Sequence, residues 1–245
     1  MQGIAERDTN PIVQLKITAV ETIDKLRSET TGKRLKSFAG YFNFAFSYKV
    51  VFLSDMKDLR EEDFDIEPEE GVAINASFML GNLISKPGCL KNLMTVMRKI
   101  NLSIMVVSEV EGNHNSPTFV NRFIEALFSS LRHYSTILLY LTALQKGVAQ
   151  DKKNSMENRE GIHSIVAAEG YERVTRSVPI SVWRAFFARF GLVELELSTA
   201  SVYQACLIVE QFSCGKSCTL DTNSKCILVG WKGTPLYSIS SWKFN

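Results

Sequence analysis

The sequence lacks an apolar run long enough to span a membrane. Its longest apolar stretch, TILLYLTAL at 136–144, is far shorter than the roughly 20 residues that a spanning helix needs. No secretory signal opens the chain, and its five cysteines are an odd number, so we expect reduced thiols in an intracellular compartment. These absences predict a protein that is neither secreted nor embedded in a membrane.

Common catalytic signatures are also missing. The chain has no glycine-rich phosphate loop of either common type and no G-x-S-x-G sequence. Nucleotide binding through those loops and the commonest α/β-hydrolase chemistry are therefore unsupported. Internal repeats and low-complexity segments are absent as well.

The charge of the chain is balanced overall but uneven along its length. The net charge is +2 over 245 residues, whereas the segment 55–70, which we call the acidic belt, has nine acidic and two basic residues. The rest of the chain is correspondingly basic. A solvated acidic face is the expected role of the belt, and the basic remainder is compatible with polyanionic or acidic partners.

Short apolar runs alternate with amphipathic stretches through the first half of the chain. This alternation is typical of βαβ units and predicts a mostly parallel sheet flanked by helices, of the Rossmann-like class. A long helix is expected from Ser116 and Pro117, because serine at the N-cap and proline after it form a strong start signal. The expected strands are 15–20, 46–54, 71–78 and 103–110.

The last third of the chain changes character. A helix over 180–190 should end at Gly191, and 192–198 alternates as a half-buried strand does. A hairpin with its turn at 221–224 follows a further helix, and 235–244 can extend the antiparallel edge of the sheet, with Trp231 and Trp242 docked. Parallel strands followed by an antiparallel hairpin are the pattern of a class I methyltransferase-like sheet, here as one domain over 1–245.

The sharpest candidate for chemistry is the sequence SEVEGNHN. Glu109, Glu111 and His114 lie just beyond a predicted strand, at the edge where α/β sheets usually place their sites. A carboxylate and a histidine there would suit an acid–base pair. The favoured interpretation is that His114 shapes the turn while both carboxylates remain solvated, because no nucleophile, cofactor loop or metal set accompanies them.

Two further sets of residues have alternative interpretations. Glu21 and Asp55 directly follow the first two expected strands, where they would either bind the ribose or base of a cofactor or stabilise helix N-termini. Cys214, Cys218 and Cys226 suggest a zinc site, but they lack a second CxxC-type pair. Buried apolar thiols are the favoured interpretation for these cysteines.

Six stretches, from AERDTNPIVQLKITAV through SPTFVNRFIEAL, HYS, REGIHSIVAAEG and VWRAFFARFG to GWKGTPLYSISSW, follow one another along the chain. Together they resemble the GRAS family of plant transcriptional regulators, and WRAFFARFG is similar to its DELLA-like members. AERDTNPIVQLKITAV resembles the stretch after that family's VHIID motif. SPTFVNRFIEAL, HYS and REGIHSIVAAEG resemble its PFYRE region, while VWRAFFARFG and GWKGTPLYSISSW resemble its SAW region. The matching residues, expected to have structural or interaction roles, are Pro117, Phe119, Arg122, Phe123, Glu125, Tyr134, Ser135, Arg159, Glu160, Trp183, Arg184, Gly191, Gly230, Trp231, Pro235, Ser240 and Trp242.

The chain also departs from the family pattern. The first leucine-rich region and the VHIID motif are missing, and the resemblance implies that VHIID forms the first, central strand of the family sheet. We therefore expect an N-terminally truncated domain in which 15–20 and 71–78 each lack the partner that this strand would supply.

The resemblance implies a non-enzymatic regulator that acts in the nucleus without a cofactor or a small-molecule substrate. Its expected partners are other GRAS proteins and transcription factors, and direct DNA binding is possible. The long helix from Pro117 and the helix around Trp183 are the expected partner faces. The alternatives are a methyltransferase-like enzyme that binds S-adenosylmethionine through Glu21 and Asp55, and a bare nucleic-acid-binding domain.

Overall fold

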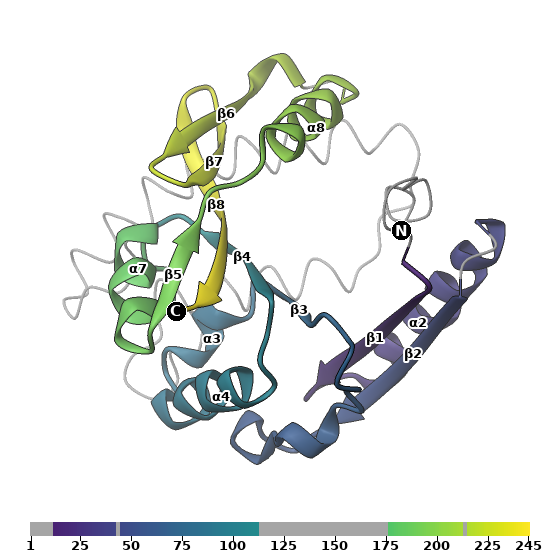
Figure 1. Cartoon of the computed structure of the whole chain (residues 1–245). Helices are drawn as coiled ribbons and strands as arrows, with labels where there is room; N and C mark the ends of the chain where they lie inside the picture. Colours follow the sequence, from purple (N-terminus) through teal and green to yellow (C-terminus); the bar gives the residue numbers. More distant parts are fainter. Residues whose placement is uncertain (1–11, 43–44, 113–175, 213–214) are drawn as a thin grey trace. The chain divides into compact units, whose positions relative to one another are not determined.

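The computed structural model describes residues 12–42, 45–112, 176–212 and 215–245 (Figure 1). The chain divides into two compact units. The first comprises Met1–Pro68 and Lys91–Ile100, and the second comprises Glu69–Leu90 and Asn101–Asn245. The single domain expected over 1–245 stays a prediction.

The first unit contains a parallel strand pair with one helix packed on it. β1 (Gln14–Glu21) pairs with β2 (Ala45–Phe52) in parallel register, and α2 (Lys25–Tyr41) connects them. The Asp24 side chain caps α2 by accepting a hydrogen bond from the Arg27 N–H at 2.9 Å. Gly32 lies directly against the Tyr48 ring, where a Cβ would overlap the ring atoms. A glycine here therefore lets α2 approach β2 closely.

Most of the acidic belt, up to Pro68, belongs to the same unit. It contains two short 3₁₀ helices, η1 (Met56–Asp58) and η2 (Glu61–Asp63). The Asn92 side-chain amide, on α4 (Pro87–Lys99), donates to the carbonyls of Met56 and Leu59 at 3.2 and 2.9 Å. Leu59 is buried, whereas the acidic side chains are exposed or half-exposed. The expected solvated acidic face is confirmed.

The second unit contains a six-stranded mixed sheet. Its strand order is β3-β4-β8-β7-β6, and β5 pairs with β8 beside this path. β3 pairs with β4 in parallel, and the other pairings are antiparallel. The bounds are β3 (Ala73–Ser77), β4 (Ile104–Val110), β5 (Leu192–Leu195), β6 (Cys218–Asn223), β7 (Cys226–Trp231) and β8 (Thr234–Phe244).

The last strand lies inside the sheet. β8 pairs with β4 along one side through Tyr237–Trp242, and on its other side with β7 and then β5. The expected edge position of 235–244 is therefore wrong. Alternation along one strand does not reveal how many neighbours it has, because pairing is decided by segments remote in sequence.

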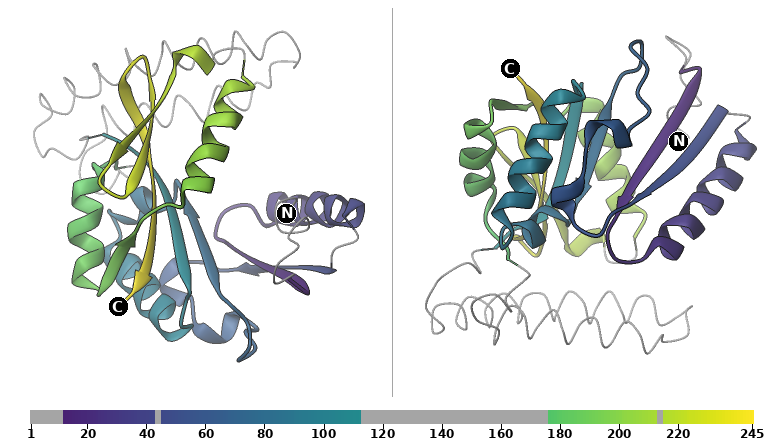
Figure 2. Two further views of the ribbon diagram at one scale, coloured as in Figure 1. Left: turned by 45° about the horizontal axis from the view of Figure 1, so that its top comes forward. Right: turned by 90° about the horizontal axis from the view of Figure 1, so that it is seen from below.

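Four helical segments accompany this sheet: α3 (Leu80–Leu83), α7 (Ile180–Arg189), α8 (Thr199–Glu210) and the 3₁₀ helix η4 (Gly215–Ser217). Figure 2 shows α7 beside β5, and α8 on the opposite side of the β5 and β8 strands. Among the described helices, none combines the length and apolar character needed to cross a membrane.

The predicted α/β, Rossmann-like class is confirmed, with parallel pairs first and the antiparallel hairpin last. The sheet is more mixed than predicted, because β8 takes only antiparallel neighbours. The hairpin turn lies at Ser224–Lys225, which overlaps the end of the expected 221–224 and extends one residue past it, and Ser224 has a φ of 57°. Within the described residues, β1 and β3 each pair with a strand on one side only.

Candidate functional site

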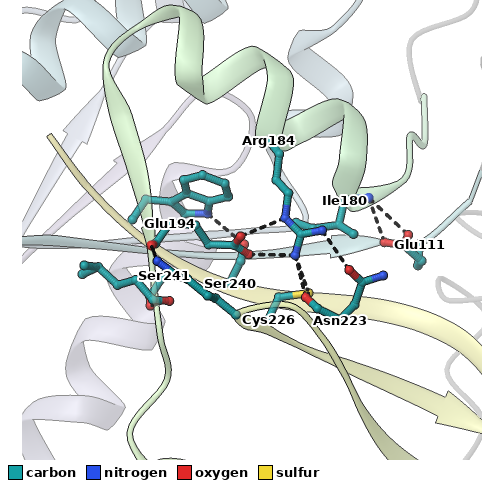
Figure 3. Close-up of polar contacts among 11 residues, drawn as sticks. Glu111, Ile180, Arg184, Glu194, Asn223, Cys226, Ser240 and Ser241 are labelled. Carbon is teal, nitrogen blue, oxygen red and sulfur yellow. Dashed lines mark hydrogen bonds and ion pairs between the residues drawn. The ribbon is translucent and has the colours of Figure 1, made fainter. Parts of the chain in front are cut away.

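A single arginine joins three elements of the second unit (Figure 3). The Arg184 guanidinium, on α7, donates to both carboxylate oxygens of Glu194 on β5, at 2.8 and 3.1 Å. It also donates to the side-chain and backbone oxygens of Asn223 in the hairpin, at 2.8 and 2.6 Å. Five donors in one plane suit such a branched contact. Arg184 therefore holds the β6–β7 hairpin against α7 and β5.

The electrostatics of this cluster support a structural role. Hydrogen bonding to Glu194, opposed by partial burial, raises the pKa of Arg184. Burial also raises the pKa of the Cys226 thiol, although the nearby Arg184 charge acts in the opposite direction. The thiol donates to the Asn223 carbonyl at 3.2 Å. Cys226 is therefore a protonated packing residue, since a reactive cysteine needs a lowered pKa.

Glu109 is a buried cap on a helix. Its carboxylate, near the end of β4, accepts a hydrogen bond from the Leu80 N–H at the start of α3, at 2.7 Å. Burial raises its pKa to about 7, although the backbone N–H groups of Leu80, Gly81 and Met79 lower it. Gly81 leaves room for this contact, since a Cβ there would lie 3.2 Å from the carboxylate and 2.5 Å from the Arg176 carbonyl oxygen.

Glu111 likewise accepts a backbone hydrogen bond at the start of a helix, here α7. Both of its carboxylate oxygens accept from the Ile180 N–H at 3.1 Å, at the first residue of α7, whose N-cap Pro179 offers no side-chain cap. The negative charge also suits the positive end of the helix. The expectation that Glu109 and Glu111 stay solvated is wrong. Each carboxylate accepts a hydrogen bond from a backbone N–H that is remote in sequence. His114 lies outside the described residues.

The two candidate cofactor carboxylates also contact nearby backbone. Glu21 accepts from the N–H groups of Thr22 and Ile23, both at 2.8 Å, and from the Ser28 hydroxyl at 3.1 Å. Burial raises its pKa, but these donors lower it to a value below the usual one. Asp55 accepts from the Lys57 N–H at 3.0 Å and caps η1. The local geometry thus favours the helix-terminus interpretation of Glu21 and Asp55 over cofactor binding.

The aromatic residues of the SAW-like stretches form the core between α7 and β8. Trp183 and Phe187 are stacked with ring centroids 5.7 Å apart, and both are buried. The buried Trp242 indole donates to the Ser240 hydroxyl at 2.8 Å. Because the apolar stripe of α7 faces this core, the expectation that the helix around Trp183 is a partner face is wrong.

The remaining motif residues shape turns and close contacts. Gly191 ends α7 with a φ of 78°, as predicted. A Cβ at Gly230 would lie 2.5 Å from the Thr219 hydroxyl and 2.6 Å from the Thr234 carbonyl. Pro235 is exposed and Trp231 is only half-buried. The positions outside the described residues are Pro117, Phe119, Arg122, Phe123, Glu125, Tyr134, Ser135, Arg159 and Glu160, together with the long helix expected from Pro117.

The two described cysteines of the hairpin do not lie close together. Cys218 pairs with Trp231 at one end of the β6–β7 hairpin, whereas Cys226 lies at the other end, and Cys214 lies outside the described residues. In the described part of the chain, no three His, Cys, Asp or Glu residues are placed to hold a metal ion.

The least expected feature is α8. Eight of its twelve residues are apolar and Glu210 is its single charged residue, yet none of them is buried. Tyr203 is 61% exposed and Ile208 is 53% exposed, and Phe212 just beyond the helix is 55% exposed. A helix that is apolar on all sides is normally covered, so this surface is a candidate docking site. The sequence predicts this helix. The one sequence signal of its exposed apolar surface is that the helix lacks a polar stripe.

Comparisons with known proteins show the family and the fold of the chain. The family model described as the GRAS domain family matches residues 1–243. The chain is 30% identical to DELLA protein 2 of Medicago truncatula and to DELLA protein GAI of Arabidopsis thaliana, over 99% and 100% of its own length. It spans 46% of each of these relatives. The structure of SCL7 from Oryza sativa aligns with a TM-score of 0.82 at 23% identity, over 99% of this chain and 68% of that one.

Proposed function

Because this chain belongs to the GRAS domain family, we propose that it is a non-enzymatic transcriptional regulator that acts in a plant nucleus through contacts with other proteins. Its partners are other GRAS proteins and transcription factors, and it reaches DNA either through them or by direct contact. The single observation that carries this proposal is the exposed apolar surface of α8, around Tyr203, Ile208 and Phe212.

The surface of α8 has the chemistry of a protein-binding site. Large apolar side chains gain free energy when a partner removes them from water, at about 25 cal/mol per Å². Tyrosine is also enriched in interfaces because its ring is apolar and its hydroxyl can form a hydrogen bond. With one charged residue among twelve, α8 suits an apolar groove or helix on a partner.

The carboxylates that were candidates for catalysis or cofactor binding support a regulator, because each already accepts hydrogen bonds from the backbone of the fold. Glu109 and Glu111 hold the starts of α3 and α7, and Glu21 holds the turn before α2. A general acid or base must reach the substrate proton that it transfers, whereas these carboxylates face backbone N–H groups.

The experiment compares two aspartate substitutions on exposed apolar residues of the second unit. Ile208→Asp places a charge on the α8 surface, and Val182→Asp does so on α7, where Val182 is 46% exposed. Binding to DELLA protein GAI is measured by surface plasmon resonance with the full chain. We expect Ile208→Asp to weaken binding at least tenfold and Val182→Asp to leave it within twofold. Equal binding by wild type and Ile208→Asp would rule out α8 as the docking surface.

A further inference from the structure

The outward face of α2 in the first unit carries a concentration of positive charge. The helix has five basic residues and one acidic residue, Glu29, and all five basic side chains are exposed. Within the described part of the chain, Lys25 pairs with Glu29 at 3.9 Å, whereas no ion pair involves the other four cations. These four are Arg27, Lys33, Arg34 and Lys36.

Apolar side chains lie at both ends of the same face. The buried positions of α2 are Gly32 and Ala39. Gly32 lies against the Tyr48 ring of β2, and Figure 1 shows the helix beside that strand. On the opposite side, helical periodicity aligns residues 26, 30, 33, 34, 37 and 41. Leu26 is 71% exposed and Tyr41 is 87% exposed, and they are about 22 Å apart at 1.5 Å per residue.

We propose that this outward face of α2 binds an acidic peptide segment of another protein, in which carboxylates alternate with large apolar side chains. Carboxylates of the segment pair with Lys33 and Arg34 in the middle of the face. Its apolar side chains cover Leu26 and Tyr41 at the two ends. An extended segment of about seven residues spans this distance at 3.3 Å per residue.

The mixed chemistry of the face favours a peptide over a nucleic acid. A phosphate backbone would neutralise the cations, but it would leave Leu26 and the nearby Ile23 in water, and Ile23 is itself largely exposed. A segment with both acidic and apolar side chains pairs with the cations of this face and also covers its apolar side chains. This surface differs from α8, whose single charge is acidic, so the inference does not depend on the role of α8.

The test uses the full chain and a fluorescein-labelled twelve-residue peptide in which Glu and Asp alternate with Leu and Phe. Fluorescence anisotropy gives the dissociation constant at 50 and 300 mM NaCl. We expect Lys33→Glu combined with Arg34→Glu to weaken binding at least tenfold at low salt. We also expect Leu26→Ser combined with Tyr41→Ser to weaken binding at least fivefold at both salt concentrations. The matched control, Lys91→Glu with Lys216→Glu, changes the net charge equally at exposed sites and should stay within twofold.

Changes in the peptide provide a second test that does not depend on the folding of any variant. A peptide with Gln and Asn in place of its acids, and one with Ser in place of its apolar residues, should each bind at least tenfold more weakly. If either altered peptide bound with the same affinity as the original peptide, the proposal would be overturned. The proposal would also be overturned if the charge reversals on α2 and the control charge reversals weakened peptide binding equally. Competition by duplex DNA, combined with no effect of the Leu26 and Tyr41 substitutions, would identify a phosphate-binding face and overturn it as well.

Discussion

The Phe187 and Trp242 rings pack against each other with centroids 4.6 Å apart and planes tilted by 53°. Phe187 lies on α7, and Trp242 lies near the end of β8. Both side chains are fully or almost fully buried. Through this pair, the last residues of the chain are part of the core of the second unit.

Removing the Trp242 ring should therefore destabilise the fold. Trp242→Ala leaves a cavity beside Phe187 and also loses the hydrogen bond to Ser240, at a cost of about 3–5 kcal/mol in the free energy of unfolding. Trp231→Ala, at a half-buried position of the same hairpin region, should cost about 1 kcal/mol. Urea unfolding followed by circular dichroism measures both. If Trp242→Ala unfolded like the wild type, Trp242 would have no packing role.

The Arg184–Glu194 pair should contribute more than a surface ion pair does. Its side chains are 26% and 10% exposed, and its bidentate geometry is favourable. A double-mutant cycle with Arg184→Leu and Glu194→Leu should give a coupling free energy of about 1–2 kcal/mol. The exposed pair Lys25–Glu29 serves as the control and should give about 0.3–0.5 kcal/mol. A coupling at Arg184 no larger than the control would contradict the joining role of this arginine.

Glu109 should make stability depend on pH in a direction opposite to that of most carboxylates. Its pKa is about 7 in the folded chain, against a usual value of 4.5. Between these values the folded state holds a proton that the unfolded state has lost, so stability falls as pH rises from about 4.5 to 7. Above about pH 8, where Glu109 is ionised in both the folded and the unfolded state, this contribution is constant.

Glu109→Gln isolates this dependence because glutamine does not titrate and can still accept from the Leu80 N–H. Free energies of unfolding from urea titrations at pH 5, 6, 7 and 8 should show wild type losing a few kcal/mol relative to the variant. Parallel curves for the two proteins would show that Glu109 does not titrate in this range.

Gly230 should not tolerate a side chain. Gly230→Ala would force a Cβ against the Thr219 hydroxyl and the Thr234 backbone carbonyl, beside the irregular register between Val229 and Gly230. We expect it to lower the free energy of unfolding by about 1–3 kcal/mol. Gly88→Ala, in α4 with no atom within 4 Å of the added Cβ, should be neutral or stabilising by up to about 1 kcal/mol. Similar melting temperatures for both variants would argue against the close approach at Gly230.

Within the described residues, local signals in the sequence predict most of the strands and helices but not how the strands pair. The end of α7 at Gly191 follows from one residue that adopts a positive φ readily. The hairpin turn at Ser224–Lys225 overlaps the expected 221–224 only at Ser224, because strand pairing continues to Asn223 and Cys226. Arg184 contacts Asn223 from a helix 39 residues away, and no local pattern shows such a contact. The central place of β8 is hidden for the same reason.

The sequence predicts where Glu109 and Glu111 lie, near the end of a strand, but not the groups that they contact. Glu109 and Glu111 stand where an α/β sheet places catalytic groups, and composition alone cannot distinguish an acid that faces a substrate from one that faces backbone. Their hydrogen-bond partners, Leu80 and Ile180, lie 29 and 69 residues away. Among the described residues, the exposure of α8 depends on which segments pack against the helix, and tertiary packing is not visible in a local sequence pattern.

The most direct test of the central claim is the transcription of a reporter gene in plant nuclei to which the full chain is recruited. The proposed function predicts that wild type changes transcription, that Val182→Asp retains the change, and that Ile208→Asp loses it while melting at the same temperature. An undiminished transcriptional effect of Ile208→Asp would contradict regulation through the α8 surface.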